Sequence, residues 1–406
     1  AAGGNAGTDE GVSEKNTAGE AKAPVSAEDS YAAVSGEYKD PLEYHLSRKD
    51  RIVLKAANAF SDSGNPVFKK DQNGRDSVSV YTDGKTGAVS WDFEVNREGL
   101  YEIGFEYLTD AEEGLQVQRE IWIDHKLPFT ESGNIAFPRK WYEASRVTKD
   151  INGDEVNPLL KQKNEWFTIK ATDVGGYTSE PFRYYLEKGK HTLTLASVSG
   201  KLSIGDISLI PAEDYPKYQE VLKEYKEKGF SEYKGKNVVL QGEDADYRSE
   251  QILRREYNSD PATQPYQKGR VVLNTIGGDN WRNANQKIEW DFYAPESALY
   301  KLNLKVFQNH GEGLNVYRQI AIDGVVPFEE VKEYPLSYSD KWQSVTISDE
   351  KGKPYLFYLS EGKHRISLEN KLGNSGYVAR EIYSINDNMS ALLRNITKVT
   401  GSDPDP

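Results

Sequence analysis

Apolar and polar residues alternate in short runs along most of the chain. Three of these runs are Leu193–Leu195, Leu302–Val306 and Ile366–Leu368, and Gly, Asp and Pro residues separate such runs from one another. A period of two is typical of β-strands that bury one face. Many short strands between frequent turns are typical of antiparallel β-sandwiches. The pattern therefore predicts an all-β-dominated chain with antiparallel sandwich (jelly-roll) architecture.

The sequence also contains an internal repeat. Trp91-Asp92-Phe93 recurs 199 positions later as Trp290-Asp291-Phe292, and the G-L-x-V-x-R motif that ends at Arg119 recurs at the same offset and ends at Arg318. The Y-L-x-x-G-K-H motif that ends at His191 returns at His364, now at an offset of 173. Similarity at a long, nearly fixed offset indicates two copies of one structural unit. The shorter second offset places an insertion in the first copy, within about residues 143–180.

Two segments have helical spacing instead of alternation. In the first, residues 214–228, Pro216 lies near the start and Gly229 follows the end, and both are typical helix-boundary residues. The second covers about residues 378–397. Apolar residues form one stripe on each predicted helix: Tyr218, Val221, Leu222 and Tyr225 on the first, and Ile382, Ile385, Met389, Leu392 and Ile396 on the second. Such a stripe needs a surface to pack on, which for the second helix is either the second copy of the repeat or a domain beyond this chain.

The repeat and the helices divide the chain into five predicted segments. They are a disordered tether and lead-in segment (1–48), β-sandwich module one (49–211), a linker helix (212–234), β-sandwich module two (235–373), and a C-terminal helix with a truncated linker (374–406). The first 30 residues are small and polar and contain no aromatic residue. They bury too little apolar surface to offset the entropy of ordering, so we expect them to be disordered.

Composition and charge narrow the classes of function. The chain has 51 Lys and Arg residues against 64 Asp and Glu residues, and the net charge of −13 opposes the attraction on which nucleic-acid binding depends. It contains no cysteine, which excludes disulfides, thiolate-bound zinc and a cysteine nucleophile. Mean hydropathy is −0.73, and no apolar run approaches the roughly 18 residues of a membrane helix. We therefore expect no nucleic-acid partner and no membrane span.

The repeat resembles known carbohydrate-binding modules. The segment Val238–Ala245, which contains Glu243-Asp244-Ala245, is similar to the first strand of galactose-binding-like modules of carbohydrate-binding families 6 and 35. The ordered series of a W-D-F strand, an R-x-I-x-I-D-G-x-x-P-F hairpin, a Y-L-x-x-G-K-H strand and a closing I-T-x-x-T-G-x-x-P-D-P segment resembles the N-terminal region of large extracellular solute-binding lipoproteins of Gram-positive ABC transporters. The resemblance covers most of residues 50–406.

This resemblance implies an extracellular, cell-surface protein that binds an oligosaccharide or polysaccharide for an ABC sugar-uptake system. It also implies a lipid anchor outside this chain as the sole membrane contact, and contact with a transporter permease through a further domain. Modules of this kind often hold a structural calcium ion, which requires several oxygen ligands from the first and last strands. Module two has Glu243 near its first strand, and module one has Asp206 near its last strand. Each copy therefore has half of the expected calcium ligands. No cofactor is required otherwise, and the alternative is that these acids lie on a solvated strand edge.

Tryptophan positions supply the candidate sugar site. Trp91 and Trp290 are equivalent in the two copies, as are Trp141 and Trp342, so we expect both pairs in the cores. Trp281 has no counterpart and lies in the polar, turn-rich stretch 277–283. Sugars present apolar ring faces and a hydroxyl rim, so a ring platform beside planar donors suits them. The predicted ligand-binding residues are Asn280, Trp281, Arg282 and Asn283. The alternative is that Trp281 folds onto its own module.

Two arginines fall at positions that alternation assigns to a buried face. Arg119 shares its face with Ile121 in module one, and Arg318 shares its face with Ile320 in module two. A buried charge requires a partner. We expect a carboxylate partner, with Asp92 and Asp291 as candidates, and the alternative is a bulge that turns each arginine outward.

Three hypotheses for the function remain open on the sequence. The first, which we favour, is non-catalytic binding of carbohydrate. The second is a structural scaffold that braces a downstream solute-binding domain without binding sugar. The third is a glycan-active enzyme, which would need two facing carboxylates. Because no P-loop, dinucleotide-binding glycine motif, G-x-S-x-G or H-E-x-x-H motif occurs, and two small similar sandwiches are a poor host for such a site, we predict that the chain is not an enzyme.

Overall fold

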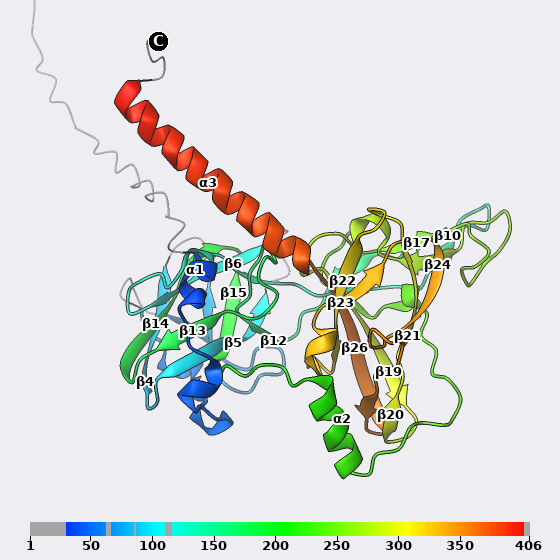
Figure 1. Cartoon of the computed structure of the whole chain (residues 1–406), viewed down its shortest axis with the longest axis horizontal. Helices are drawn as coiled ribbons and strands as arrows, with labels where there is room; N and C mark the ends of the chain where they lie inside the picture. Colours follow the sequence, from blue (N-terminus) through cyan, green and yellow to red (C-terminus); the bar gives the residue numbers. More distant parts are fainter. Residues whose placement is uncertain (1–29, 62–65, 85–86, 110–115, 402–406) are drawn as a thin grey trace, which may run out of the picture.

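The computed structural model describes residues 30–61, 66–84, 87–109 and 116–401 (Figure 1). The predicted tether up to residue 29, the last residues 402–406, and Gly114 and Leu115 of the repeat motif lie outside these ranges. Within them the chain is mostly antiparallel strand, with one helix between two sandwich modules and a second at the C-terminal end. The predicted all-β fold class is confirmed, including both helices. Two separate clusters of buried apolar residues form the cores, one spanning Tyr31–Leu209 and the other Tyr218–Leu368.

Module one consists of a seven-stranded sheet packed on a four-stranded sheet. The first sheet has the order β12-β5-β15-β3-β2, and β1 and β13 pair with β15 and β5. The second has the order β4-β14-β6-β7. The strands are β1 Ile52–Leu54, β2 Val67–Lys69, β3 Ser79–Thr82, β4 Ala88–Val95, β5 Gly99–Thr109, β6 Val117–Ile123, β7 Ile135–Phe137, β12 Phe167–Lys170, β13 Arg183–Leu186, β14 Gly189–Ser199 and β15 Leu202–Pro211.

Strand β15 holds the seven-stranded sheet together. It pairs antiparallel with β1 on one part of its length, with β3 on another, and with β5 on the opposite edge. Its inward residues Ile204, Ile207 and Leu209 are at most 2 % exposed, and they pack in the same cluster as Trp91 and Phe105. The alternation of apolar and polar residues in this strand therefore places a complete apolar layer between the two sheets.

Module two has one continuous sheet and three short strand pairs. The seven-stranded sheet has the order β11-β8-β16-β19-β26-β22-β23, and the pairs are β17–β18, β20–β25 and β21–β24. The strands are β8 Trp141–Glu143, β11 Leu160–Gln162, β16 Tyr247–Arg248, β17 Arg255–Tyr257, β18 Leu273–Ile276, β19 Lys287–Ala294, β20 Ala298–Tyr300, β21 Asn303–Gln308, β22 Asn315–Ile322, β23 Tyr334–Ser337, β24 Ser339–Thr346, β25 Phe357–Leu359 and β26 Gly362–Lys371.

The insertion in the first copy crosses to module two. Strands β8 and β11 lie within it or at its start, and β8 pairs with β16, where Trp141 faces Arg248. The Glu143 carboxylate accepts a hydrogen bond from Arg248 at 2.6 Å, and Arg248 is almost fully buried. A short hairpin, β9 Thr148–Lys149 with β10 Glu155–Val156, follows in the same segment. Part of the range predicted for module one thus belongs to the sheet of module two, while the predicted segment boundaries themselves stay predictions.

The three helices differ in what they bury. Helix α1 (Tyr31–Gly36) lies in the predicted lead-in segment and places Tyr31 in the core of module one. Helix α2 (Tyr218–Glu227) buries Tyr218, Val221 and Leu222 in the core of module two, and Gly229, with φ +71°, follows its end. Among the residues that the structure describes, no helix has the length and apolar character of a membrane span.

Helix α3 (Asn374–Thr400) is longer than the sequence predicts and projects away from both modules (Figure 1). Its stripe residues stay between 48 % and 65 % exposed; they are Ile382, Ile385, Met389, Leu392 and Ile396. The sequence-based alternative that this stripe packs on module two is therefore wrong.

Candidate functional site

The structure separates the two pairs of equivalent tryptophans. Trp91 and Trp290 lie in the two cores, as predicted, and their indole nitrogens donate to the carbonyl oxygens of Lys55 at 3.2 Å and Gly242 at 2.9 Å. Trp141 is instead half-buried on β8, the strand that crosses to module two. Trp342 is half-buried on β24, where its ring stacks on Phe307 with the centroids 5.5 Å apart. The core prediction for this second pair is wrong, because Trp141 pairs with Arg248 in the sheet of module two and Trp342 lies on the separate strand pair β21–β24.

Trp281 is less open than an exposed platform would be. It follows a 3-10 helix, Gly278–Asn280, and its indole nitrogen donates to the Gln286 carbonyl at 3.1 Å. The guanidinium carbon of Arg318 lies 4.3 Å from the ring centroid, and a Cβ added to Gly277 would come within 2.8 Å of the ring. The ring is half-buried and packs against the core of module two, in agreement with the alternative that Trp281 folds onto its own module. The guanidinium group of the buried Arg318 stacks on one face of the ring in a cation–π contact.

The other three predicted ligand-binding residues surround this ring with exposed side chains. The Asn280 amide donates to Glu256 Oε1 at 3.3 Å. The backbone of Asn283 is bound at both groups, since its N–H donates to Gln286 Oε1 at 2.9 Å and its carbonyl accepts from Asn370 Nδ2 at 2.8 Å. Arg282 adds an exposed guanidinium. The loop thus offers polar groups beside a half-covered ring, and sugar binding by these four residues stays a prediction.

Neither buried arginine has the predicted carboxylate partner. The Arg119 guanidinium donates to the carbonyls of Gln118 and Ser199, both at 2.7 Å, and to the carbonyl of Gly200 at 2.9 Å. Arg318 donates to the Tyr317 carbonyl at 3.0 Å and to Asn370 Oδ1 at 2.7 Å. Burial lowers the pKa of both guanidinium groups to about 10.

The proposed acidic partners bond elsewhere. Asp92 accepts from the Thr192 hydroxyl at 2.7 Å, and Asp291 binds Arg365. The carboxylate prediction failed because neutral oxygens accept from both guanidinium groups: backbone carbonyls for Arg119, and one backbone carbonyl with the Asn370 amide oxygen for Arg318.

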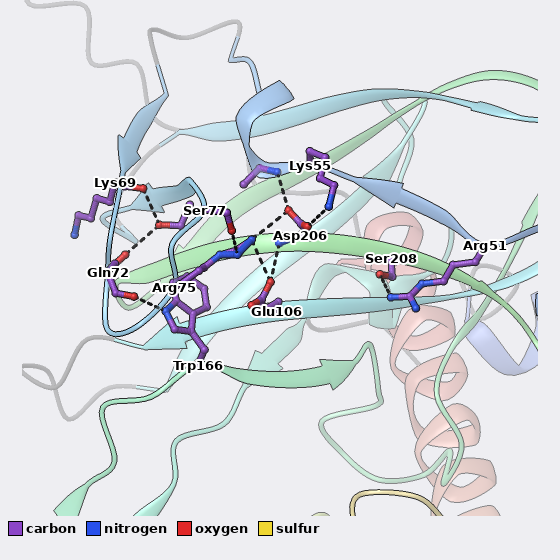
Figure 2. Close-up of polar contacts among 12 residues, drawn as sticks. Arg51, Lys55, Lys69, Gln72, Arg75, Ser77, Glu106, Trp166, Asp206 and Ser208 are labelled. Carbon is purple, nitrogen blue, oxygen red and sulfur yellow. Dashed lines mark hydrogen bonds and ion pairs between the residues drawn. The ribbon is translucent and has the colours of Figure 1, made fainter.

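Asp206, the candidate late calcium ligand, lies on β15 among cationic groups (Figure 2). Its carboxylate accepts from Lys55 Nζ at 2.7 Å, from Arg75 at 3.2 Å, and from the Ala56 backbone N–H at 3.3 Å. The same Arg75 nitrogen lies 3.1 Å from Glu106 Oε2, and the Arg75 side chain is 7 % exposed. A calcium ion needs oxygen ligands, whereas the groups facing Asp206 here are hydrogen-bond donors. The residues around Asp206 therefore do not fit calcium.

Glu243, the candidate early ligand, lies in the 3-10 helix Gly242–Asp244 of module two. It is 4 % exposed, and burial raises the pKa of its carboxyl group. The neighbouring Asp244 binds Arg255 at 2.7 Å. Within the described ranges, no group of three or more His, Asp or Glu side chains is placed to hold a metal ion. Calcium binding by this chain stays a prediction, and the geometry supplies half a ligand set at best.

The structure brings together a cleft that the sequence did not indicate. It has a volume of about 550 Å³ and lies where α1, the 176–183 segment and the start of α3 meet. Its lining includes Tyr38, Tyr177, Glu180, Arg183, Asp214 and Tyr377. We call it the tyrosine cleft. Residues so far apart along the chain carry no shared motif, so sequence reasoning could not assemble them.

Charged groups at the base of the tyrosine cleft hold one another in place. Arg183 donates to Asp214 at 2.6 Å and to Glu180 at 3.2 Å, and the second oxygen of Glu180 accepts from Lys332 of module two at 2.5 Å. The Arg183 backbone N–H donates to the Tyr31 hydroxyl at 3.0 Å. Burial raises the pKa of Tyr38 to about 12, so its hydroxyl stays neutral.

Aromatic rings also line the tyrosine cleft. Tyr177 lies with its ring centroid 5.6 Å from that of Tyr383 on α3. Tyr377 is 59 % exposed, and the guanidinium carbon of Arg380 lies 5.2 Å from its ring centroid. The cleft therefore combines accessible ring faces with fixed hydrogen-bonding groups.

Comparisons with known proteins find similarity in structure alone. No protein-family model matches the sequence, and no curated protein matches it. Among similar solved structures is the GH26-CBM35 β-(1,4)-mannanase of Podospora anserina, with 13 % identity and a TM-score of 0.27 over 49 % of this chain and 32 % of the mannanase. The match thus spans less than a third of that enzyme.

Two isolated carbohydrate-binding modules are similar over nearly their whole length. A family 35 module from Clostridium thermocellum shares 12 % identity, with a TM-score of 0.24 over 40 % of this chain and 98 % of the module. The family 35 module of Cellvibrio japonicus Abf62 shares 14 % identity, with a TM-score of 0.25 over 40 % of this chain and 94 % of the module.

Proposed function

We propose that this chain binds carbohydrate without catalysis and that the tyrosine cleft is its binding site. The observation that carries the proposal is a cleft of about 550 Å³ whose lining combines the exposed ring of Tyr377 and the half-buried rings of Tyr38 and Tyr177 with fixed guanidinium and carboxylate groups. Ligand pockets commonly measure about 300–1,000 Å³. A pyranose has apolar C–H faces that pack on aromatic rings and hydroxyl groups that bond planar donors and acceptors. The two kinds of group lie within one cleft.

Ion pairing in the cleft favours binding over hydrolysis. A glycosidase needs one carboxylic acid that gives up a proton and a second carboxylate at a set distance. Glu180 and Asp214 both accept hydrogen bonds from Arg183, and Glu180 also binds Lys332. Both carboxylates are thus already bound to cationic side chains of the protein. The residues of this cleft therefore orient a ligand rather than cleave it.

The wider context of the proposal comes from the resemblance of the sequence to known modules. The repeated module and its first-strand motif Glu243-Asp244-Ala245 support carbohydrate as the ligand class. The ordered motifs support a cell-surface protein of an ABC sugar-uptake system, anchored by a lipid outside this chain and reaching the permease through a further domain.

A scaffold role is the second candidate, and one observation favours it. The insertion of module one supplies β8 and β11 to the sheet of module two, and the Lys140 ammonium binds Glu289 across the same junction at 2.7 Å. A shared sheet fixes the two modules to each other, as a spacer would require.

A binding screen on four proteins separates these two functions. Wild type, Tyr177→Ala, Trp281→Ala and Tyr293→Ala would be tested on glycan arrays and by affinity electrophoresis, with calcium and with chelator. Tyr293 is 55 % exposed on β19 and lines neither candidate site, so it is the matched control. We expect wild type and Tyr293→Ala to bind, and Tyr177→Ala to lose about fivefold in affinity, because one ring contact contributes roughly 1 kcal/mol.

Two other outcomes of this screen would contradict the proposal. Loss in Trp281→Ala alone would move the site to the loop at residues 280–283. Failure of wild type to bind any plant, bacterial or host glycan would reject the binding proposal in favour of the scaffold.

A further inference from the structure

Two motifs of the internal repeat meet at one contact in each module. The Y-L-x-x-G-K-H motif ends in His191 and His364, and the I-D-x-x-x-P-F hairpin supplies Asp124 and Asp323. His191 Nδ1 lies 2.7 Å from Asp124 Oδ2, and His364 Nδ1 lies 2.7 Å from Asp323 Oδ2. Sugar binding at the tyrosine cleft uses neither pair. The contact is nevertheless a shared feature of both modules.

Both nitrogens of each histidine ring face an oxygen that accepts hydrogen bonds. The Nε2 atom of His191 lies 2.8 Å from the Glu187 carbonyl oxygen, and that of His364 lies 2.8 Å from the Ser360 carbonyl oxygen. Because carbonyl and carboxylate oxygens have no proton to give, the ring has to donate at both positions. A neutral imidazole has one N–H group, whereas an imidazolium has two. The doubly protonated ring therefore satisfies the whole contact.

In module two the aspartate of this contact also fixes a tight turn. Asp323 has a φ of +52° and begins the turn at residues 323–325, which the backbones of Ile322 and Val325 close with two hydrogen bonds of 2.9 Å. Asp323 Oδ1 accepts from the Arg365 N–H at 2.8 Å, and the Asp323 N–H donates to the Arg365 carbonyl at 2.8 Å. The carboxylate thus fastens the turn to β26, and the His364 ring holds the carboxylate.

The surroundings of the His364 ring contain one bonded charge. The side chain is 9 % exposed, and β19 presents the ring of Phe292 to it, with the centroids 5.8 Å apart. The turn after β22 presents the Asp323 carboxylate. Side chains alternate along each strand, so the charged neighbours on β19 and β26 lie on the opposite face of the sheet; they are Asp291, Lys363 and Arg365. Of these, Asp291 and Arg365 bond each other at 2.9 Å.

The pKa of His364 follows from this geometry. Burial alone would lower the pKa, but the hydrogen bonds to Asp323 and to the Ser360 carbonyl, together with the charge of Asp323, raise it above its ordinary value. A histidine whose pKa is higher in the folded chain stabilises the fold fully below its unfolded value, roughly 6.5. This contribution is lost as the pH rises through the folded-state pKa.

We propose that His364 is a proton-dependent lock on the turn at residues 323–325, closed while the ring carries two protons and released when it loses one. The Asp323 carboxylate retains the proton on Nδ1, so the proton leaves from Nε2. The Nε2 lone pair then faces the lone pairs of the Ser360 carbonyl, and the contact becomes repulsive. The nearest alternative donor, the Ser360 hydroxyl, lies 3.4 Å away.

Release is confined to the turn. The two backbone bonds between Asp323 and Arg365 do not depend on the ring, so β26 stays in its sheet while the turn becomes more mobile. Module one has the same contact at His191, with matching distances on both ring nitrogens. Protonation of a histidine that biases a local two-state element is a common pH-sensing device.

Nuclear magnetic resonance of the wild-type chain tests the lock without any substitution. Long-range correlation spectra of the histidine rings would be recorded between pH 5.5 and pH 9, together with amide exchange rates corrected for intrinsic base catalysis. We expect the His364 ring to carry two protons in more than half of the molecules at pH 7. Amide exchange at Asp323 and Val325 should become roughly tenfold faster between pH 6 and pH 9, because the turn opens more often.

Three variants separate the lock from a purely structural contact. His364→Gln keeps a polar side chain but does not titrate, so exchange at the turn should no longer depend on pH. Asp323→Asn should move the titration midpoint of His364 down by about one pH unit, since it removes the opposite charge. His310→Gln is the matched control, because the His310 side chain is 71 % exposed and lies away from this turn, and it should change nothing.

Three results would overturn the proposal. They are a singly protonated His364 ring at pH 7, corrected exchange rates at Asp323 that do not change between pH 6 and pH 9, and the same pH dependence in His364→Gln. If a variant fails to fold, the wild-type spectra still decide the first two. The measurements use no sugar, so their outcome is independent of the carbohydrate-binding proposal.

Discussion

The two modules share their sequence motifs but complete their sandwiches in different ways. In module one, a single strand, β15, joins β1, β3 and β5 into one sheet. In module two the same motifs are present, yet the corresponding sheet remains three strand pairs, while the opposite sheet gains β8 and β11 from the other module. The comparison teaches that a repeat specifies the strands that carry its motifs. The strand that closes the sandwich depends on the residues after the last motif.

The modules also differ in where they bury charge. Module one places Arg75 between Glu106 and Asp206 where the register of β15 shifts against β5. Module two has no equivalent of that strand among its described residues, but it pairs Glu369 with Lys287 and Lys371 in its continuous sheet. At the equivalent positions of module one, the residues are Ala196, Ala88 and Val198. Each module therefore depends on a different ionic cluster, and the two clusters can be broken separately.

Removing the core tryptophan should give the largest effect and should distinguish a closed core from an open one. Trp91 is 1 % exposed and Trp290 is 8 % exposed at the equivalent position. Truncation of a buried tryptophan to alanine commonly costs about 3–5 kcal/mol. We expect Trp91→Ala to lower the free energy of unfolding of module one by about 4 kcal/mol, and Trp290→Ala to lower that of module two by about 3 kcal/mol, since an open layer relaxes more easily.

Hydrogen exchange with peptide-level readout, combined with urea unfolding, would measure both losses in the whole chain. Protection of β4 and β14 reports on module one, and protection of β19 and β26 reports on module two. Equal losses in the two variants would mean that module two is as tightly packed as module one, which would contradict the open-core interpretation.

Replacing Arg75 should have the next largest effect. Arg75→Met keeps the side-chain volume but leaves Glu106 and Asp206 with Lys55 as the remaining cation. Removing one partner of a buried ion pair costs about 3–5 kcal/mol, and because both carboxylates are partly exposed we expect about 3 kcal/mol. Lys305→Met, at the position equivalent to Glu106, is the control and should cost less than about 0.5 kcal/mol.

The melting temperature of Arg75→Met with and without calcium tests the prediction of a calcium site at Asp206. In wild type, calcium or chelator should leave the melting temperature of module one unchanged, because Arg75 and Lys55 already neutralise the carboxylates. In Arg75→Met, calcium should restore part of the lost stability. A calcium-dependent melting temperature in wild type would show that a metal ion binds despite these cations.

Much of the fold could be predicted from the sequence, because its signals are local. Alternation and turns indicated the strands, and the spacing of Tyr218, Val221 and Leu222 indicated α2. The contribution of β8 and β11 to the sheet of module two was not predictable, since the pairing of Trp141 with Arg248 depends on two segments about 100 residues apart. The periodicity of a sequence does not show which sheet a hairpin will join.

The candidate site was less predictable for the same reason. Trp281 lies in a polar stretch, and the residue that covers its ring, Arg318, comes from another strand. The tyrosine cleft draws on Tyr38, Tyr177 and Tyr377, which meet through the packing of α1 and α3. Such a site becomes visible once the tertiary arrangement is known.

Acid should destabilise module two before module one, and we expect this effect to be the smallest of those described here. Burial alone would raise the pKa of Glu369, but Lys371 and Lys287 outweigh burial and lower that pKa to about 2. A carboxyl group whose pKa is lower in the folded chain stabilises the fold above its unfolded value, roughly 4.3, and this contribution disappears as the pH falls toward 2.

We expect module two to lose about 1–2 kcal/mol between pH 5 and pH 2.5 through this group, a modest figure because the pair is partly solvated. Glu369→Gln should be less stable at pH 7 and should lose less on acidification. Urea unfolding at both pH values, resolved by hydrogen exchange in β26 against β14, would measure the difference. A steeper loss in β14 would show that the acids of module one, such as Asp206, control acid unfolding instead, which would reverse the assignment of the pH-sensitive cluster to module two.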